Sequence, residues 1–473
     1  MKRMDVIMKR KIRFSLLFLM LLLSGLTVHA ESKGYLVQFR EGLVSNTEKY
    51  QWKAIDEQKG IYLVEALDSL QGLEEYIEYL LPNQEIFLIE GKQNRMSSFS
   101  LQKTESDFEQ WQLQMIHAED WWNLETYGNS VKIAVIDSGC SFHEDLQPNL
   151  LEGKNYFKDN NDVTDTIGHG THVSGIIAAE MNEFGINGVA PKAKLVPLKC
   201  FDSGETTYMD EIIEAIYDAV DVYQCNIINM SWGLKKDNLF LKQAIEYAHE
   251  KGVILIASVG NDGTDELFYP AAYDEVIGVG SVGKGKERSA FSQYNTSVLV
   301  AAPGEQVYST GKDGAYEYLQ GTSQAAPFVS GLAAVVLSAK EEMTPTEFRQ
   351  LLTESAEDLG EIGYDNHFGY GLVNAEALLE TLMNTMECYT SPINTTDSDS
   401  YILIQNNTNV ELNCLSIFSR FENRNFLGCI QTKVTLLPKE KTILKTEKGK
   451  ESLTHVLWDD LECLTPLSVK REG

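Results

Sequence analysis

Residues 131–139 read VKIAVIDSG, an apolar run that ends in a polar turn. Similar short apolar runs recur at 194–198, 227–228 and 253–257. Segments with helical spacing of apolar residues lie between them, at 170–181, 209–222, 239–251 and 323–340. Buried strands that alternate with helices predict an α/β fold, in which a mainly parallel sheet is covered by helices on both faces. We assign residues 107–385 to this three-layer α/β/α domain.

Polar residues stand where such a sheet gathers its functional side chains, beyond the carboxyl ends of the strands. Asp137 ends the first run, and two polar segments open predicted helices: GHGTHVSG with His169, and GTSQAAP with Ser323. Each segment alone is weak evidence, because Asp-Ser-Gly is a common turn and a histidine among glycines is often structural. In the order Asp, His, Ser they become specific. A serine hydroxyl needs an adjacent base, and a carboxylate fixes the tautomer of that base.

These segments resemble the subtilisin family of serine proteases, and the resemblance covers roughly residues 107–382. The matching stretches are 131–139, 168–175, 188–191, 228–233, 260–261 and 321–327. The resemblance implies a catalytic triad of Asp137, His169 and Ser323. It also implies that Asn261 donates a hydrogen bond to the oxyanion, together with the amide of Ser323 at a helix N-terminus. His172 is expected to be a packed structural histidine.

A substrate groove follows from the same resemblance, because an extended peptide pairs with exposed backbone edges. The residues implied to line it are Ser231, Trp232, Gly233, Ala257, Ser258, Gly260 and Phe268. Two of them depart from the family pattern. Trp232 replaces the commoner leucine, and Phe268 stands at the pocket floor, where relatives commonly carry a small or polar residue. Phe268 either fills the pocket or turns aside, and the sequence leaves both open.

A structural calcium ion is the one cofactor left open, since catalysis by a triad requires none. Asp145 and Asn182 match family calcium ligands, and Asp107 falls near a third with a loose alignment. Oxygen ligands of this kind suit Ca²⁺. The other interpretation is an ordinary acidic loop at 180–187.

The first 30 residues have the layout of a secretory signal peptide: a basic start, an apolar run at 14–23, and small residues before Ala30. An uncleaved signal anchor is the alternative. The apolar run is short for a membrane span, and no later stretch is long and apolar enough for one. We therefore expect a secreted product without an integral membrane segment once the signal is removed.

Residues 31–106 resemble the inhibitor-like propeptide of secreted subtilisins, followed by a polar linker. Strands are expected at 35–39, 60–64 and 85–89, and a helix at 70–81, which makes a small α+β unit. The resemblance implies an intramolecular inhibitor that leaves after self-cleavage between about Gly91 and Asp107. A permanent adhesion domain is the rival interpretation.

Residues 386–473 contain several short β-like runs, and we expect a small β-sandwich there. Its role is either a stabilising accessory domain or attachment to the cell surface or a substrate. The net charge of −29 excludes nucleic acid as a partner, because an acidic surface repels phosphates. Among seven cysteines, Cys140 lies near Asp137. It either pairs with Cys200, is reactive, or is a plain buried cysteine, which we favour.

The sequence therefore predicts a secreted serine endopeptidase, made as a zymogen, whose partners are protein or peptide substrates and its own propeptide. The alternative is a catalytically silent exported binding protein on the same scaffold, which loss of a triad or oxyanion residue would indicate. None is lost. A metal-dependent hydrolase is disfavoured, because no HExxH or comparable ligand cluster occurs.

Overall fold

The computed structural model describes residues 33–40, 52–88, 110–458 and 471–472. Short gaps within these ranges fall at 75, 124–125, 183, 205, 387, 391–392, 396–398, 408, 410, 423–424 and 448–451. The predicted signal peptide, the linker from Gly91 to Glu105, and Asp107 lie outside the described residues.

A seven-stranded sheet forms the centre of the molecule, and every neighbouring pair in it is parallel. Its order is β14 (Val300–Pro303), β13 (Val276–Val282), β12 (Ile254–Ser258), β10 (Ile227–Met230), β6 (Lys132–Asp137), β8 (Lys194–Lys199), β7 (Lys154–Asn155). The predicted parallel sheet is confirmed. The strands read as continuous apolar runs because a parallel sheet is buried on both faces.

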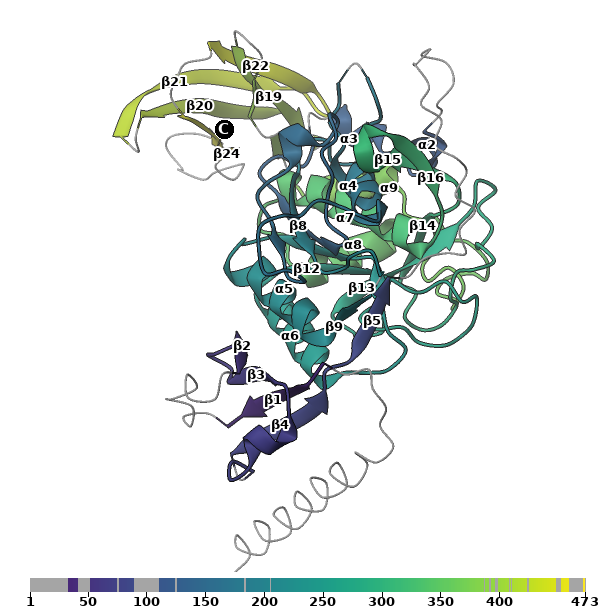
Figure 1. Cartoon of the computed structure of the whole chain (residues 1–473). Helices are drawn as coiled ribbons and strands as arrows, with labels where there is room; N and C mark the ends of the chain where they lie inside the picture. Colours follow the sequence, from purple (N-terminus) through teal and green to yellow (C-terminus); the bar gives the residue numbers. More distant parts are fainter. Residues whose placement is uncertain are drawn as a thin grey trace, which may run out of the picture.

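Helices cover both faces of this sheet, as Figure 1 shows. Their bounds are α4 (His169–Ala178), α5 (Met209–Asp221), α6 (Leu239–Glu250), α7 (Thr322–Ala339), α8 (Pro345–Ser355) and α9 (Ala375–Asn384), with α2 (Trp111–Met115) and α3 (Glu119–Trp122) ahead of the sheet. Along β6 the side chains alternate: Ile133 and Val135 pack with α4 and α7, whereas Ala134 and Ile136 pack with α5 and α6. The predicted three-layer α/β/α architecture is confirmed.

One helix among the described residues, α7, is long and apolar enough to cross a membrane, and all of it is buried within the protein. A hairpin of β15 (Val307–Thr310) and β16 (Tyr316–Leu319) precedes it. The burial and the contacts with β10, β12 and β13 show that α7 is a core helix, which packs on the sheet next to α4.

The N-terminal unit, residues 33–88 as described, contains an antiparallel sheet in the order β2 (Lys53–Asp56), β3 (Ile61–Val64), β1 (Tyr35–Phe39), β4 (Ile77–Pro82). The predicted helix at 70–81 is wrong. A short 3₁₀ turn ends at Leu70, Gly72 adopts a left-handed φ of 85°, and the following segment pairs with β1. The apolar residues of this segment have helical spacing, but Ile77–Pro82 forms strand β4 because it pairs with the edge of β1 that β3 leaves free.

Strand β5 (Glu85–Leu88) continues from this unit but belongs to a different sheet. It lies between β11 (Trp232–Gly233) and β9 (Thr206–Tyr208) of the peptidase-like domain and is antiparallel to both. In Figure 1 the N-terminal unit lies beneath α5 and α6, and β5 extends from it along the domain.

The C-terminal region forms two antiparallel sheets. One contains β17 (Cys388–Thr390), β18 (Asn394–Thr395), β19 (Asp399–Asn406) and β22 (Lys441–Glu447); the other contains β20 (Leu412–Glu422), β21 (Asn425–Leu436), β23 (Ser452–Trp458) and β24 (Arg471–Glu472). Ile402 and Ile404 of the first sheet share a hydrophobic cluster with Phe418 and Leu436 of the second. Two sheets around a common core are the arrangement of a β-sandwich.

Candidate active site

Asp137 and His169 lie in direct contact. Asp137 is the last residue of β6 and His169 is the first residue of α4. His169 Nδ1 lies 2.8 Å from Asp137 Oδ1, and both side chains are buried. The Ser138 amide donates a second hydrogen bond to the same carboxylate oxygen at 2.7 Å. The carboxylate can therefore fix the imidazole tautomer in which Nδ1 carries the proton.

Asp165, which the sequence analysis did not single out, positions the start of α4. Its Oδ1 accepts hydrogen bonds from the amides of Ile167 and Gly168, and its Oδ2 accepts from the amide and hydroxyl of Thr171. Asp165 lies three residues before Gly168, the N-cap residue of α4, so the usual N-cap pattern did not reveal it. Gly170 is required for the close approach, because a Cβ there would lie 2.2 Å from the Gly139 carbonyl oxygen.

Ser323 lies in the first turn of α7, which packs against α4. Its hydroxyl donates to the carbonyl of Ser231 at 3.1 Å, and the Ser231 hydroxyl donates back to the Ser323 carbonyl at 3.0 Å. This reciprocal pair ties the predicted nucleophile to the segment that leads into β11. The N-termini of two neighbouring helices thus carry His169 and Ser323, and the N-terminus of α7 favours nearby negative charge.

Asn261 has a fixed amide orientation. Its Oδ1 accepts hydrogen bonds from the amide of Thr322 at 2.8 Å and from the Thr322 hydroxyl at 2.9 Å. The Oδ1 edge is thereby occupied, so Nδ2 is the edge that can donate to a substrate. A Cβ on Gly321 would lie 2.9 Å from that Nδ2, so glycine at 321 keeps space beside the donor. Thr322 is a second positioning residue that the motif did not reveal.

His172 is a structural histidine, as its contacts indicate. It is fully buried, and its Nε2 lies 3.0 Å from the Val307 carbonyl oxygen. Burial, reinforced by the nearby His169, lowers the pKa of His172 to about 3. The ring therefore stays neutral at the pH where a general base works.

Lys199 is a buried lysine beside Asp137, and no sequence pattern pointed to it. Its Nζ donates to the carbonyls of Ser138 at 2.7 Å and Phe201 at 3.0 Å, and β8 places it opposite Asp137. Burial lowers the pKa of Lys199, an effect that the nearby carboxylates of Asp165, Asp202 and Asp137 oppose.

Two of the predicted groove residues, Gly233 and Phe268, line a cavity of about 410 Å³. Its lining includes Glu85 and Leu88 of β5, together with Gly233, Lys235, Asn261 and Phe268. Trp232 faces the core and is fully buried, so it offers only its backbone to this groove. Ala257 and Ser258 are buried in β12.

Phe268 turns inward. It is 8% exposed, and a Cβ on Gly260 would lie 3.0 Å from its Cδ2 atom. The ring therefore packs on the α-carbon of Gly260, which has a φ of 111°. Phe268 thus forms part of the wall of the cavity of about 410 Å³.

Both carboxylate oxygens of Asp145, a predicted calcium ligand, already accept hydrogen bonds within the protein. Asp145 is buried, and its Oδ1 accepts from Asn182 Nδ2 at 3.1 Å. Its Oδ2 accepts from the Ile186 amide at 2.9 Å and from the Tyr316 hydroxyl at 2.7 Å. A cation cage would gather oxygen ligands around one point, whereas three hydrogen-bond donors converge here. This arrangement does not fit a cation, and we derive no step through calcium.

The cysteines near the site are free thiols. Cys140 and Cys200 are both buried, and no disulfide joins them. Cys225 is also a buried free thiol. Burial raises the pKa of the Cys140 thiol to about 12, with Asp165 adding to the shift. A thiol with that pKa is protonated at neutral pH and is therefore a poor nucleophile, which agrees with the favoured interpretation of a plain buried cysteine.

Comparison with known proteins points in the same direction. The family model described as "Subtilase family" matches residues 128–371. The chain is 41% identical over 255 residues to the major intracellular serine protease of Bacillus subtilis (strain 168), covering 51% of this chain and 78% of that protein. It is 37% identical to subtilisin DY of Bacillus licheniformis, covering 53% and 91%. With the minor extracellular protease Epr of Bacillus subtilis (strain 168), it shares 36% identity over 58% of this chain but only 42% of that protein.

Proposed function

Because the chain belongs to the subtilase family of serine proteases, we propose that it is a secreted endopeptidase with Asp137, His169 and Ser323 as its triad, made as a zymogen. The observation that carries this proposal is the 2.8 Å contact between Asp137 Oδ1 and His169 Nδ1. His169 lies at the N-terminus of α4, and α4 packs against α7, whose first turn contains Ser323.

The proposed reaction proceeds through an acyl-enzyme. His169 takes the proton from the Ser323 hydroxyl as its oxygen attacks the peptide carbonyl carbon, and the carbonyl oxygen becomes an oxyanion. The Ser323 amide and Asn261 Nδ2 stabilise this oxyanion. His169 then gives its proton to the leaving amine as the C–N bond breaks. A water molecule, deprotonated by the same imidazole, releases the acyl group and regenerates the serine.

Strand β5 supports both the substrate class and the inhibitory role of residues 31–106. Leu88 pairs with Trp232 and residue 87 with Gly233, so β5 runs antiparallel to β11 and toward Ser231. Ser231 is the residue whose carbonyl accepts the Ser323 hydroxyl. An extended segment paired on both edges is the way in which a peptide substrate would bind. The N-terminal unit therefore acts as an intramolecular inhibitor that fills the groove.

The pocket supports a preference for small side chains before the scissile bond. Phe268 packs against Gly260 at the position where the family pattern implies an open floor. A ring at this position reduces the depth available to an aromatic or long side chain. Steric mismatch of this kind discriminates by about 10- to 200-fold per methylene-scale difference.

Secretion rests on the signal-like residues 1–30 and on relatives that include a protein named as extracellular, although another is named as intracellular. The C-terminal β-sandwich is proposed as an accessory domain. Attachment to the cell surface is the alternative role.

The proposal is tested with purified full-length precursor and its Ser323→Ala variant. We expect the wild-type precursor to cut itself and then to degrade an unrelated unfolded protein, while the Ala variant stays intact and inactive. A Ser323→Ala chain that matures in isolation contradicts self-processing. An intact, folded wild-type chain without any activity favours the silent binding protein.

A further inference from the structure

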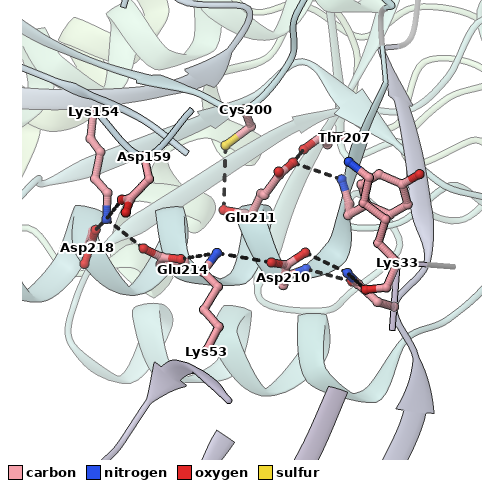
Figure 2. A network of polar contacts seen from close by, with 12 residues as sticks. Lys33, Lys53, Lys154, Asp159, Cys200, Thr207, Asp210, Glu211, Glu214 and Asp218 are labelled. Carbon is pink, nitrogen blue, oxygen red and sulfur yellow. Dashed lines mark hydrogen bonds and ion pairs between the residues drawn. The ribbon is translucent and has the colours of Figure 1, made fainter. Parts of the chain in front are cut away.

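The N-terminal unit also contacts the peptidase domain away from the groove, on helix α5. Asp210, Glu214 and Asp218 follow one another at helical-turn spacing and share one face of this helix. Lys53 of β2 reaches between the first two: its Nζ lies 3.2 Å from Asp210 and 2.9 Å from Glu214 (Figure 2). The Asp210 and Glu214 side chains are only 6% and 15% exposed, so solvent screens this contact incompletely.

Asp210 depends on the N-terminal unit for both of its carboxylate oxygens. Asn83 Nδ2 donates to Oδ1 at 2.7 Å, and Lys53 takes Oδ2. The Asp210 amide, one of the first N–H groups of α5, donates to Asn83 Oδ1 at 3.1 Å. Glu214 is different, because Lys154 of the peptidase domain itself lies 2.7 Å from it. When the N-terminal unit leaves, the Asp210 carboxylate therefore loses its hydrogen bonds to Asn83 and Lys53, whereas Glu214 keeps its ion pair with Lys154.

Two further lysines of the N-terminal unit contact aromatic rings of the peptidase domain. Lys59 Nζ lies 3.8 Å from the ring centre of Tyr217 on α5 and 3.5 Å from that of Tyr247 on α6. Lys33 Nζ lies 4.7 Å from the ring centre of Tyr208. In the part of the unit that the structure describes, every lysine (33, 53 and 59) is seated on a carboxylate or an aromatic face of the peptidase domain. Aromatic faces attract ammonium groups electrostatically.

We propose that Asp210, Glu214, Tyr217 and Tyr247 form a lysine-binding face, a second recognition surface separate from the groove, whose partner is the N-terminal unit of this chain. The face keeps the unit bound after the connecting bond is cut, so the unit leaves as ionic strength rises. This inference rests on the proposed zymogen function.

Two linked attachments hold the N-terminal unit on the peptidase domain. β5 holds the groove through backbone hydrogen bonds and apolar contacts, which salt affects little. The lysine-binding face holds the same unit through charge, and its attraction weakens as the Debye length shortens from about 10 Å at 0.1 M salt. A single exposed ion pair would contribute little, but Lys53 and Lys59 on this face act together with the groove contact.

The test uses the full-length precursor and measures the lag before a chromogenic peptide is hydrolysed, at about 50 mM and about 500 mM NaCl. Lys53→Met and Lys59→Met are compared with Lys53→Arg, which keeps the charge. Arg40→Gln serves as a control, because Arg40 is an exposed cation of the same unit outside these contacts. All four changes lie in the segment that is removed, so the mature enzyme has the same sequence in every case.

We expect the wild-type lag to shorten several-fold in high salt. Lys53→Met and Lys59→Met should give the short lag at both salt concentrations, while Lys53→Arg and Arg40→Gln behave as the wild type. Co-elution of the cut unit with the peptidase on size exclusion should follow the same order. Asp210→Asn provides a check from the peptidase side should a lysine variant not fold.

The inference is overturned if Lys53→Met and Asp210→Asn leave the lag and its salt dependence unchanged. This outcome is distinct from failure of the proposed function, in which the wild-type precursor neither cuts itself nor hydrolyses the peptide at any salt concentration.

Discussion

Leu88 of the N-terminal unit lies opposite Trp232 of the peptidase domain in an antiparallel strand pair. Ser231, the next residue along that edge, holds the hydroxyl of Ser323 on its carbonyl. The register thus directs the N-terminal unit toward Ser323, the proposed nucleophile. We therefore predict a scissile bond immediately after β5, upstream of the range from about Gly91 to Asp107 that the sequence alone suggested.

The first prediction concerns this bond. N-terminal sequencing of the peptidase released from purified precursor should give a first new terminus one to three residues after Leu88, because Leu88 already lies opposite Trp232, the neighbour of Ser231. Early time points distinguish the first cut from later trimming. A first terminus far downstream, near Asp107, would show that β5 is not bound as a substrate is.

Phe268→Gly should widen specificity. Removing the ring that packs on Gly260 opens the pocket floor, so kcat/KM for peptides with phenylalanine before the scissile bond should rise at least about tenfold relative to alanine peptides. Phe142→Ala is the matched control, because Phe142 is 68% exposed. An unchanged ratio would mean that another residue sets the depth of the pocket.

Chelation should leave the protein intact. The Asp145 carboxylate already accepts hydrogen bonds from Asn182, Ile186 and Tyr316, so EDTA should not change the melting temperature of the Ser323→Ala precursor. A drop that added Ca²⁺ reverses would restore the calcium prediction.

Tyr316→Phe is the companion change at this site. It removes a hydroxyl that donates to a buried carboxylate, which should cost about 1.5–3 kcal/mol and lower the melting temperature by several degrees. Tyr318→Phe, on the same strand and 36% exposed, should have a much smaller effect. Equal effects of the two substitutions would remove the special role of Tyr316.

His172 should make the fold sensitive to acid. Its pKa falls from an ordinary 6.5 to about 3 in the folded state, so between these values the unfolded chain binds a proton that the folded chain does not. Stability from this residue is therefore undiminished above pH 6.5 and falls by about 1.4 kcal/mol per pH unit as the pH drops toward 3. His172→Gln in the Ser323→Ala precursor should flatten the melting-temperature profile in that window; an identical profile would contradict the assignment.

Local patterns predicted the peptidase domain well. The helices that begin at His169, Met209, Leu239 and Thr322 start within one residue of their expected positions. Their apolar spacing and their start signals agree, and tertiary packing reinforces the same choice. The proposed triad was recognisable because turns and helix caps alone do not explain why Asp137, His169 and Ser323 occur together in these three segments.

Long-range contacts escaped the sequence analysis for a physical reason. Lys53 and Asp210 are separated by 157 residues, and the local sequence around either residue does not predict its contact with the other. The segment 70–81 has apolar residues at helical spacing, yet the free edge of β1 draws Ile77–Pro82 into the sheet. Thr322 and Tyr316 act by orienting Asn261 and Asp145, which only the assembled fold reveals.

The central claim is that His169 activates the hydroxyl of Ser323. The most direct measurement is the rate at which a fluorophosphonate labels the folded chain, with the adduct mapped by mass spectrometry. The account predicts one adduct per chain, at Ser323, and a loss of labelling rate of about 10²- to 10⁴-fold in His169→Ala, the range expected for removal of a general base. Labelling of another residue, or an unchanged rate in His169→Ala, would contradict it.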